Sequence, residues 1–342
     1  MWLIHKSNCA YSGCSKSNQE GVFLLNRMTF PDSDSVLRTN YSFRNRIDEN
    51  YHNYKSRIEE LKFEIVEDIP LDYIHVVLLG VVKRLLRMWL CGKTTALLPN
   101  RDVLVLNKRL EQISSTQPSE FQRKVRSLSE VGNYKATEFR TFVKYTGPFI
   151  LKNVLPQEKY NNFLLLHVSI CILCDPVLCI NYNDLSKELL KAFVSTFGRI
   201  YGESNIVYNV HSLIHLPNDV KKYGNLDEFS AFQFESFMYR IKMLLRKNNQ
   251  PLAQVCNRLT EIQQSSYVRG KENDVKYPCL KKKQVLENNK IVYRKIILKN
   301  CSIDNSIKNC WVFTKEKQIV CFEHEEIVHD EILIYGFEQC MQ

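Results

Sequence analysis

The chain has 342 residues, of which 44% are hydrophobic, and a formal net charge of +10 at pH 7. This composition predicts a globular protein with a sizeable core, organised as one large domain or two ordinary ones. No run approaches the roughly 18 apolar residues of a membrane span, and the first residues lack a secretory segment. We therefore expect a soluble protein of the nucleus or the cytoplasm that is neither secreted nor bound to a membrane.

The twelve cysteines are scattered along the chain, several of them inside apolar helical runs. This distribution indicates buried reduced thiols and not a disulfide framework. Near the N-terminus, Cys14 is followed three residues later by Ser17, where a second cysteine would complete a Cys-x-x-Cys pair. The serine argues against a zinc knuckle at this point.

Residues 1–62 are polar and lack a periodic apolar pattern, so we expect an irregular remnant of a larger core. Residues 63–92 predict a strand, a break at Pro70 and a helix whose apolar positions recur every three or four residues. Asp72 lies near the start of that helix, where a carboxylate is favoured by unpaired N–H groups. An ordinary helix cap is the simplest interpretation of Asp72 taken alone.

Residues 93–230 predict a helical region. The expected helices cover residues 101–115, 119–129, 136–147, 157–174, 184–201 and 207–216. His211 and His215 are four residues apart and share a helix face, which is a spacing used by metal ligands. Without the glutamate of a His-Glu-x-x-His motif, two packing histidines are the favoured interpretation.

Residues 231–265 predict two helices, the first of which carries Glu235 among aromatic residues. A basic block follows, because residues 236–299 contain 15 Lys and Arg against four Asp and Glu. Such a block is typical either of a surface that binds phosphate backbone or of a solvated helix face and linker. The candidate DNA-binding residues are Arg240, Lys242, Arg246, Lys247, Lys281, Lys282 and Lys283.

Residues 266–289 read as a basic linker. Residues 290–342 change to a period of two with β-branched residues, and this pattern predicts a small β module. The module has three Lys and Arg against eight Asp and Glu from residue 300 onward. Its negative charge argues against a second DNA-binding surface.

Four stretches together resemble a known family. They are Leu37-Arg38-Thr39, Asp68 to His75 with Leu79 to Lys83, Tyr208 to Leu216, and Ser230 to Glu235. In order and spacing these stretches are similar to the transposases of CACTA-type (EnSpm-like) DNA transposons, in the form found in animal genomes. The similarity extends from Cys14 to about Tyr335.

This resemblance implies an α+β fold, predominantly helical, with a partial RNase H-like core interrupted by a long helical insertion. It implies a DDE-type acidic triad that binds Mg²⁺ or Mn²⁺ and acts on the DNA of transposon ends. It also implies that the chain can associate with further copies of itself. Asp72 would be the second acid and Glu235 the last, and both would be metal ligands. His75 would support Asp72 in an Asp-x-x-His signature.

The family's first aspartate would precede residue 1, so we expect an inactive chain that binds no ion productively. Three hypotheses follow. The chain is an inactive transposase derivative, or a domesticated DNA-binding or protein-interaction module, or a zinc-dependent hydrolase built on His211 and His215.

Overall fold

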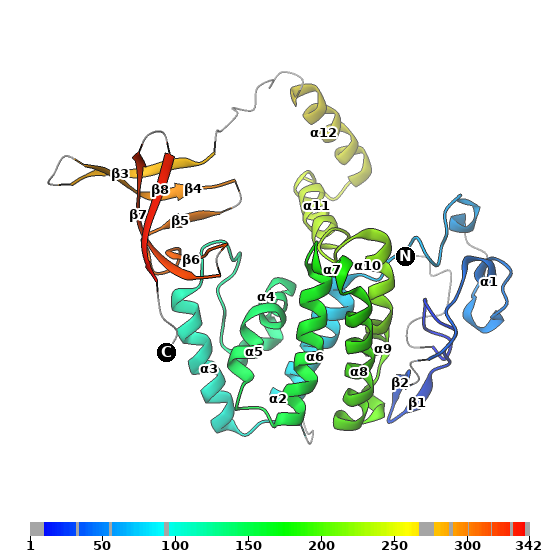
Figure 1. Ribbon diagram of the computed structural model, residues 1–342. Coiled ribbons are helices and arrows are strands. Elements are labelled where there is room, and N and C mark those ends of the chain that lie inside the picture. Colours follow the sequence, from blue (N-terminus) through cyan, green and yellow to red (C-terminus); the bar gives the residue numbers. More distant parts are fainter. Residues whose placement is uncertain are drawn as a thin grey trace. The chain divides into compact units, whose positions relative to one another are not determined.

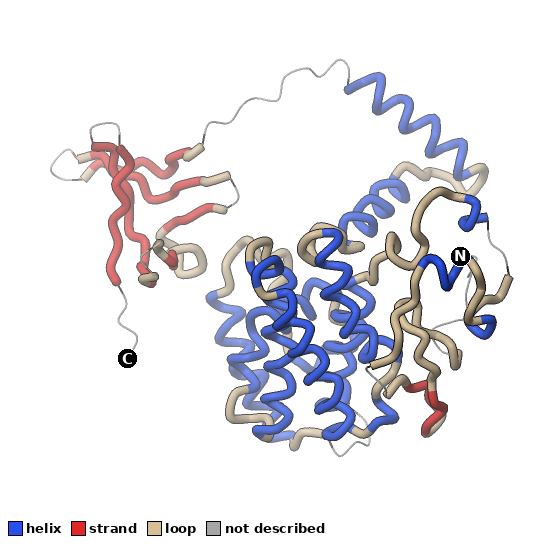
Figure 2. The backbone as a smooth tube through the Cα atoms, turned by 45° about the vertical axis from the view of Figure 1, so that its right-hand side comes forward, coloured by secondary structure: helices blue, strands red, loops and turns tan. Residues whose placement is uncertain are grey.

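The computed structural model describes residues 10–31, 34–54, 57–91, 96–266, 277–286, 290–299, 301–315, 317–328 and 331–338. The chain forms two compact units, which are Met1–Leu110 with Ser127–Lys242, and Glu111–Arg126 with Met243–Gln342. Helices dominate the first unit and an antiparallel sheet the second, which confirms the α+β class (Figures 1 and 2). None of the described helices is both long and apolar enough to cross a membrane.

The N-terminal part of the first unit is irregular, as the sequence predicted. It contains a short hairpin and three short helical turns: β1 (Val22–Leu24), β2 (Arg27–Thr29), α1 (Asn40–Arg44), η1 (Glu49–Tyr51) and η2 (Arg57–Glu60). This segment is attached to the helical body by backbone hydrogen bonds, such as the one that Phe30 N donates to Ile206 O over 2.8 Å.

The helical body is built from α-helices joined by short 3-10 and π segments. The segments up to residue 151 are η3 (Ile74–Val82, π), α2 (Lys83–Leu90), α3 (Asn100–Thr116), η4 (Leu128–Asn133), α4 (Ala136–Thr141), η5 (Phe142–Thr146, π) and α5 (Gly147–Leu151). Those that follow are α6 (Gln157–Cys174), α7 (Leu178–Asn181), α8 (Asn183–Tyr201), η6 (Glu203–Asn205), α9 (Tyr208–Ser212), η7 (Leu213–His215), α10 (Leu216–Tyr223) and α11 (Phe232–Met243).

Five of the six helices expected between residues 101 and 216 are confirmed, although several are longer or change to 3-10 or π geometry. The helix expected over 119–129 is wrong. Residues 117–127 form a loop closed by Gln117, whose side-chain nitrogen donates to Arg123 O over 2.9 Å and whose oxygen accepts from Val125 N over 2.8 Å. An amide that satisfies backbone groups in this way competes with helix formation.

The core of the first unit lies where α6 packs on α8 (Figure 1). Phe163 of α6 is fully buried, and its ring lies 6.1 Å from Trp89 and 5.7 Å from Phe142. Trp89 donates its indole N–H to the hydroxyl of Tyr201 over 3.0 Å, so its one polar group is satisfied. Burial in this core accounts for the apolar residues of α6 from Phe163 onward, of which Leu166, Ile170 and Leu173 are fully buried.

The strand expected at the start of 63–92 is not formed. Residues 63–72 form turns and loop, and Ile65 and Val66, buried against Phe43 and Tyr51, pair with no strand in the described part of the chain. The strands described in the first unit are β1 and β2 alone, so an RNase H-like core is not confirmed.

The second unit contains α12 (Pro251–Ser266) and a six-stranded antiparallel sheet. Its strands are β3 (Cys279–Val285), β4 (Ile291–Ile297), β5 (Ser302–Asp304), β6 (Trp311–Phe313), β7 (Ile319–Val328) and β8 (Glu331–Glu338). The expected β module over 290–342 is therefore present. Their order is β3-β4-β7-β6, with β5 on β4 and β8 on β7 (strands labelled in Figure 1).

The basic linker expected over 266–289 is wrong where the structure describes it. Residues 267–276 and 287–289 lie outside the described residues, but 279–285 is the edge strand β3. Its lysines do not prevent pairing with β4, because charged side chains are tolerated on edge strands, where they discourage association with a further strand.

Candidate functional site

The structure brings Asp72, His75 and Glu235 together, although Asp72 and Glu235 are 163 positions apart in the sequence. The ring of His75 lies between the two carboxylates, with Nδ1 on Asp72 Oδ2 and Nε2 3.9 Å from Glu235 Oε1. Asp72 stands at the start of η3 and Glu235 in the first turn of α11. The cluster faces solvent, since the side chain of His75 is 64% exposed and that of Glu235 is 54% exposed.

Asp72 is occupied by four N–H donors. Its Oδ1 accepts from Ile74 N over 3.2 Å and from Ala231 N over 3.1 Å. Its Oδ2 accepts from His75 N over 3.2 Å and from His75 Nδ1. A carboxylate has about four lone-pair sites, so Asp72 is saturated. It caps η3 and at the same time holds the chain that leads into α11.

These contacts decide how well the expected Mg²⁺ or Mn²⁺ fits. Such an ion needs free carboxylate lone pairs in an octahedral arrangement. Glu235 offers them, but Asp72 does so only after giving up hydrogen bonds that hold two helix starts. Among the described residues, no Asp and Glu set of three brings its oxygens within 4.8 Å of one another. The arrangement does not fit a two-metal site.

The helix α11 carries exposed aromatic and basic side chains. Phe234, Phe237 and Tyr239 are each more than half exposed, and Arg240 and Lys242 are exposed beside them. The aromatic residues around Glu235 are thus not buried, and none of the residues of α11 belongs to the core. Just before this helix, the hydroxyl of Ser230 donates to Asp227 O over 3.3 Å.

The remaining basic candidates belong to the second unit. Arg246 and Lys247 follow α11 as exposed residues, and the side chain of Gln254 accepts from both of their backbone N–H groups. Lys281, Lys282 and Lys283 lie in β3 and not in a linker.

Two of the stretches that carry the transposase resemblance contact each other in the first unit. The π-helix η3 packs against α9. A Cβ atom added at Gly80 would lie 2.6 Å from the side-chain nitrogen of Asn209 and 2.6 Å from His75 O. Only glycine allows this approach, and π segments of this kind often accompany functional sites.

A second cluster lies in the interior of the first unit, where Cys14 meets His211 and His215. The Sγ of Cys14 is 3.6 Å from His215 Nε2, and the two Nε2 atoms are 3.3 Å apart. The hydroxyl of Ser17 lies 3.2 Å from Cys14 Sγ and 3.5 Å from His211 Nε2. Among the described residues this is the one group of three Cys, His, Asp or Glu with all ligand atoms within 4.8 Å.

All four residues of this cluster are at most 3% exposed. Burial, with a smaller contribution from His211, lowers the pKa of His215 to about 3, so its imidazole is neutral at pH 7. Phe30 covers His211, with 5.7 Å between ring centroids. Catalytic zinc sites keep one position open to water or substrate, so the burial of all four side chains argues against the zinc-dependent hydrolase.

Sequence reasoning missed this convergence. It noted the Cys14 and Ser17 spacing and the His211 and His215 spacing separately, but about 200 residues lie between the two pairs. The signal that could have found it is that Cys14 with Ser17, and His211 with His215, each form only half of a four-ligand metal set.

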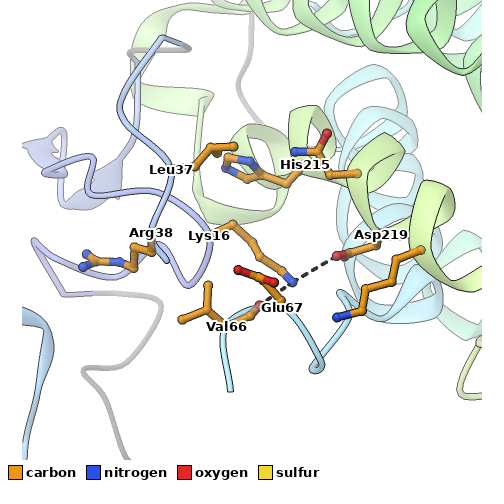
Figure 3. Close-up of a pocket in the computed structure, with 9 residues that line it drawn as sticks. Lys16, Leu37, Arg38, Val66, Glu67, His215 and Asp219 are labelled. Carbon is orange, nitrogen blue, oxygen red and sulfur yellow. Dashed lines mark hydrogen bonds and ion pairs between the residues drawn. The ribbon is translucent and has the colours of Figure 1, made fainter. Parts of the chain in front are cut away.

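A pocket of about 140 Å³ lies next to this cluster, and His215 forms part of its wall (Figure 3). Lys16 crosses the pocket wall as a buried cation. Its ammonium donates to Asp219 Oδ1 over 3.0 Å and to the carbonyl oxygens of Val66 and Ile69, each over 2.9 Å. All three donors of Lys16 are therefore used within the protein, and the lysine holds the N-terminal segment in place.

Comparisons with known proteins add no family: the chain matches no protein-family model, no curated protein and no solved structure.

Proposed function

We propose that this protein derives from a CACTA-type transposase and binds DNA through α11 without cutting it. The observation that carries the proposal is the exposed surface of α11, where Arg240 and Lys242 stand among Phe234, Phe237 and Tyr239. Cations bind the phosphate backbone by releasing condensed counterions, and exposed aromatic rings stack on unpaired bases. The resemblance supports the same assignment, since Glu235 would be the last acid of the parent enzyme.

We expect no DNA cleavage because the carboxylate of Asp72 is already used in hydrogen bonds. Metal-dependent cleavage needs ions held by free carboxylates, whereas Asp72 spends its lone pairs on the starts of η3 and α11. In this proposal the cluster of Asp72, His75 and Glu235 is a remnant of the parent site that now positions α11. The parent enzyme would have an RNase H-like core with the helical region 93–230 as its insertion.

The binding half of the proposal is tested by salt titration of the full chain with a labelled duplex and a labelled single strand. The affinity should fall steeply with salt, with a slope of about −0.9 per phosphate contact on duplex DNA. The double variant Arg240→Glu, Lys242→Glu should bind more weakly and show a smaller slope. The matched control is Lys281→Glu, Lys283→Glu, which changes charge equally on β3.

A flat salt response of the wild-type chain, or an equal loss in both double variants, would contradict binding through α11. The cleavage half is tested by incubating the DNA and the chain with Mg²⁺ or Mn²⁺, and we expect no strand breaks. Cleavage that Glu235→Gln abolishes would overturn this half.

A second candidate is a protein-interaction module, which the exposed apolar residues of α11 favour. Met238 is 61% exposed and Met243 is 65% exposed. This candidate expects DNA affinity that is weak and indifferent to the two basic residues, so the same titration separates it from the first.

A further inference from the structure

We propose that Cys14, His211 and His215 bind one Zn²⁺ ion, with the hydroxyl of Ser17 at the fourth corner of a closed structural site. Nothing in the proposed DNA binding requires this ion. The site is carried by the geometry of four buried side chains that come from two distant parts of the chain.

The distances match the edges of a zinc-centred tetrahedron. With Zn–N bonds of about 2.05 Å and Zn–S bonds of about 2.3 Å, the expected edges are about 3.3 Å between nitrogens and about 3.6 Å between nitrogen and sulfur. The separations here are 3.3 Å from His211 Nε2 to His215 Nε2 and 3.6 Å from His215 Nε2 to Cys14 Sγ. Ser17 Oγ lies 3.2 Å from Cys14 Sγ and 3.5 Å from His211 Nε2, which places it near the fourth corner.

A hydrogen bond is the alternative explanation, because 3.3 Å between two imidazole nitrogens also suits a long N–H···N contact. A metal ion uses a lone pair from both Nε2 atoms at once, whereas a hydrogen bond requires one of them to carry a proton. Thiolate and neutral imidazole are the ligands that zinc prefers, and tetrahedral coordination is usual in its structural sites.

Because the cluster is buried, the zinc ion would have a structural and not a catalytic role. Catalytic zinc sites keep one position open to water or substrate, and none of these four side chains is more than 3% exposed. The ion would join the N-terminal segment to α9 and the 3-10 turn after it. It would act beside Lys16, which joins the same segment to α10 through Asp219.

The test is zinc content and affinity of the purified full chain, measured by elemental analysis and by competition with a chelator. We expect one zinc per chain in the wild type. Cys14→Ser and His215→Gln should each lower the affinity about tenfold or more. Cys179→Ser and His167→Gln are matched controls, because a buried thiol and a partly buried histidine elsewhere in the unit should leave the zinc in place.

Two further measurements do not depend on the folding of the loss variants. Cobalt added to the wild-type chain should produce thiolate charge-transfer absorption and the intense visible bands of a tetrahedral site. Ser17→Cys should tighten zinc binding about tenfold, because a second thiolate replaces a weak oxygen ligand. A wild-type chain that binds neither zinc nor cobalt, or a Ser17→Cys variant with unchanged affinity, would overturn the proposal.

Discussion

Asp72 shows how one carboxylate can satisfy two helix starts. It accepts from Ile74 N and His75 N at the beginning of η3, and from Ala231 N just before α11. A catalytic and a capping interpretation make different demands on this residue. If Asp72 is a cap, replacing it lowers the free energy of unfolding even without metal ions. If it is only a metal ligand, replacing it in the metal-free protein removes a negative charge and does not lower that free energy.

Asp72→Ala should therefore lower the free energy of unfolding by about 1–2 kcal/mol, the usual cost of losing a cap. Glu235→Ala removes a carboxylate that is 54% exposed and should change it by less than about 0.5 kcal/mol. Urea unfolding of both variants in the absence of divalent ions measures the difference. Equal stability of Asp72→Ala and wild type would contradict the capping role.

Glu325 and Glu326 are neighbours in β7 with opposite electrostatic situations. Glu325 is fully buried, and desolvation raises its pKa to about 7. The pKa of Glu326 is lowered, chiefly by its hydrogen bond with Lys290 and with a contribution from His324. The two residues are thus a matched pair for measuring pH dependence in the second unit.

Because the folded pKa of Glu325 lies above its unfolded value, its contribution to stability is complete below the unfolded pKa. It is lost as pH rises through about 7. Glu325→Gln should leave the sheet more stable than wild type at pH 8 and equal or less stable at pH 5. Glu326→Gln should destabilise the sheet at pH 8. Hydrogen exchange of β7 amides, compared with wild type at the same pH, reads out both changes.

At the scale of elements, the junction between η5 and α5 depends on a close approach to α6. A Cβ atom added at Gly147 would lie 2.5 Å from the Phe163 ring and 2.7 Å from Phe142 O. The ring is fully buried and the carbonyl belongs to the backbone, so neither can move away cheaply. The small residue is what allows the two segments to pack.

Gly147→Ala should lower the free energy of unfolding of the first unit by about 1–3 kcal/mol. The control is Gly132→Ala, where a Cβ atom meets nothing within 4 Å and the stability should stay equal or rise slightly. Thermal or urea unfolding of the two variants separates steric overlap from a general effect of replacing glycine.

The whole molecule consists of two units, each with its own buried residues. Phe163 and Trp89 are buried in the first unit, and Phe322 of the sheet is buried in the second. Chains with separate cores often unfold in more than one transition. Each unit is assembled from two stretches of the chain, and the boundaries fall inside α3 and α11.

We expect two unfolding transitions in the full chain. Gly147→Ala should lower one of them, and Glu325→Gln should raise the other above pH 7. Hydrogen exchange assigns each transition to its unit. A single transition that both variants shift together would show that the two units unfold as one.

The sequence by itself determined the elements whose pattern is local. The helical periodicity of 157–174 and 184–201 and the alternation of 291–298 all appear in the structure, because side-chain spacing along one element is a property of neighbouring residues. The transposase resemblance pointed to Asp72, His75 and Glu235, which lie close together in the structure.

Features that depend on contacts between distant parts of the chain were decided only by the tertiary structure. Residues 63–66 have strand-forming side chains but pair with none of the strands that the structure describes, whereas Lys281 to Lys283 form a strand because β4 pairs with them. The saturation of Asp72 depends on Ala231, 159 residues away. The convergence of Cys14 with His215 depends on a separation of 201 residues. Such partners are not encoded in local spacing, since they exist only once the chain has packed.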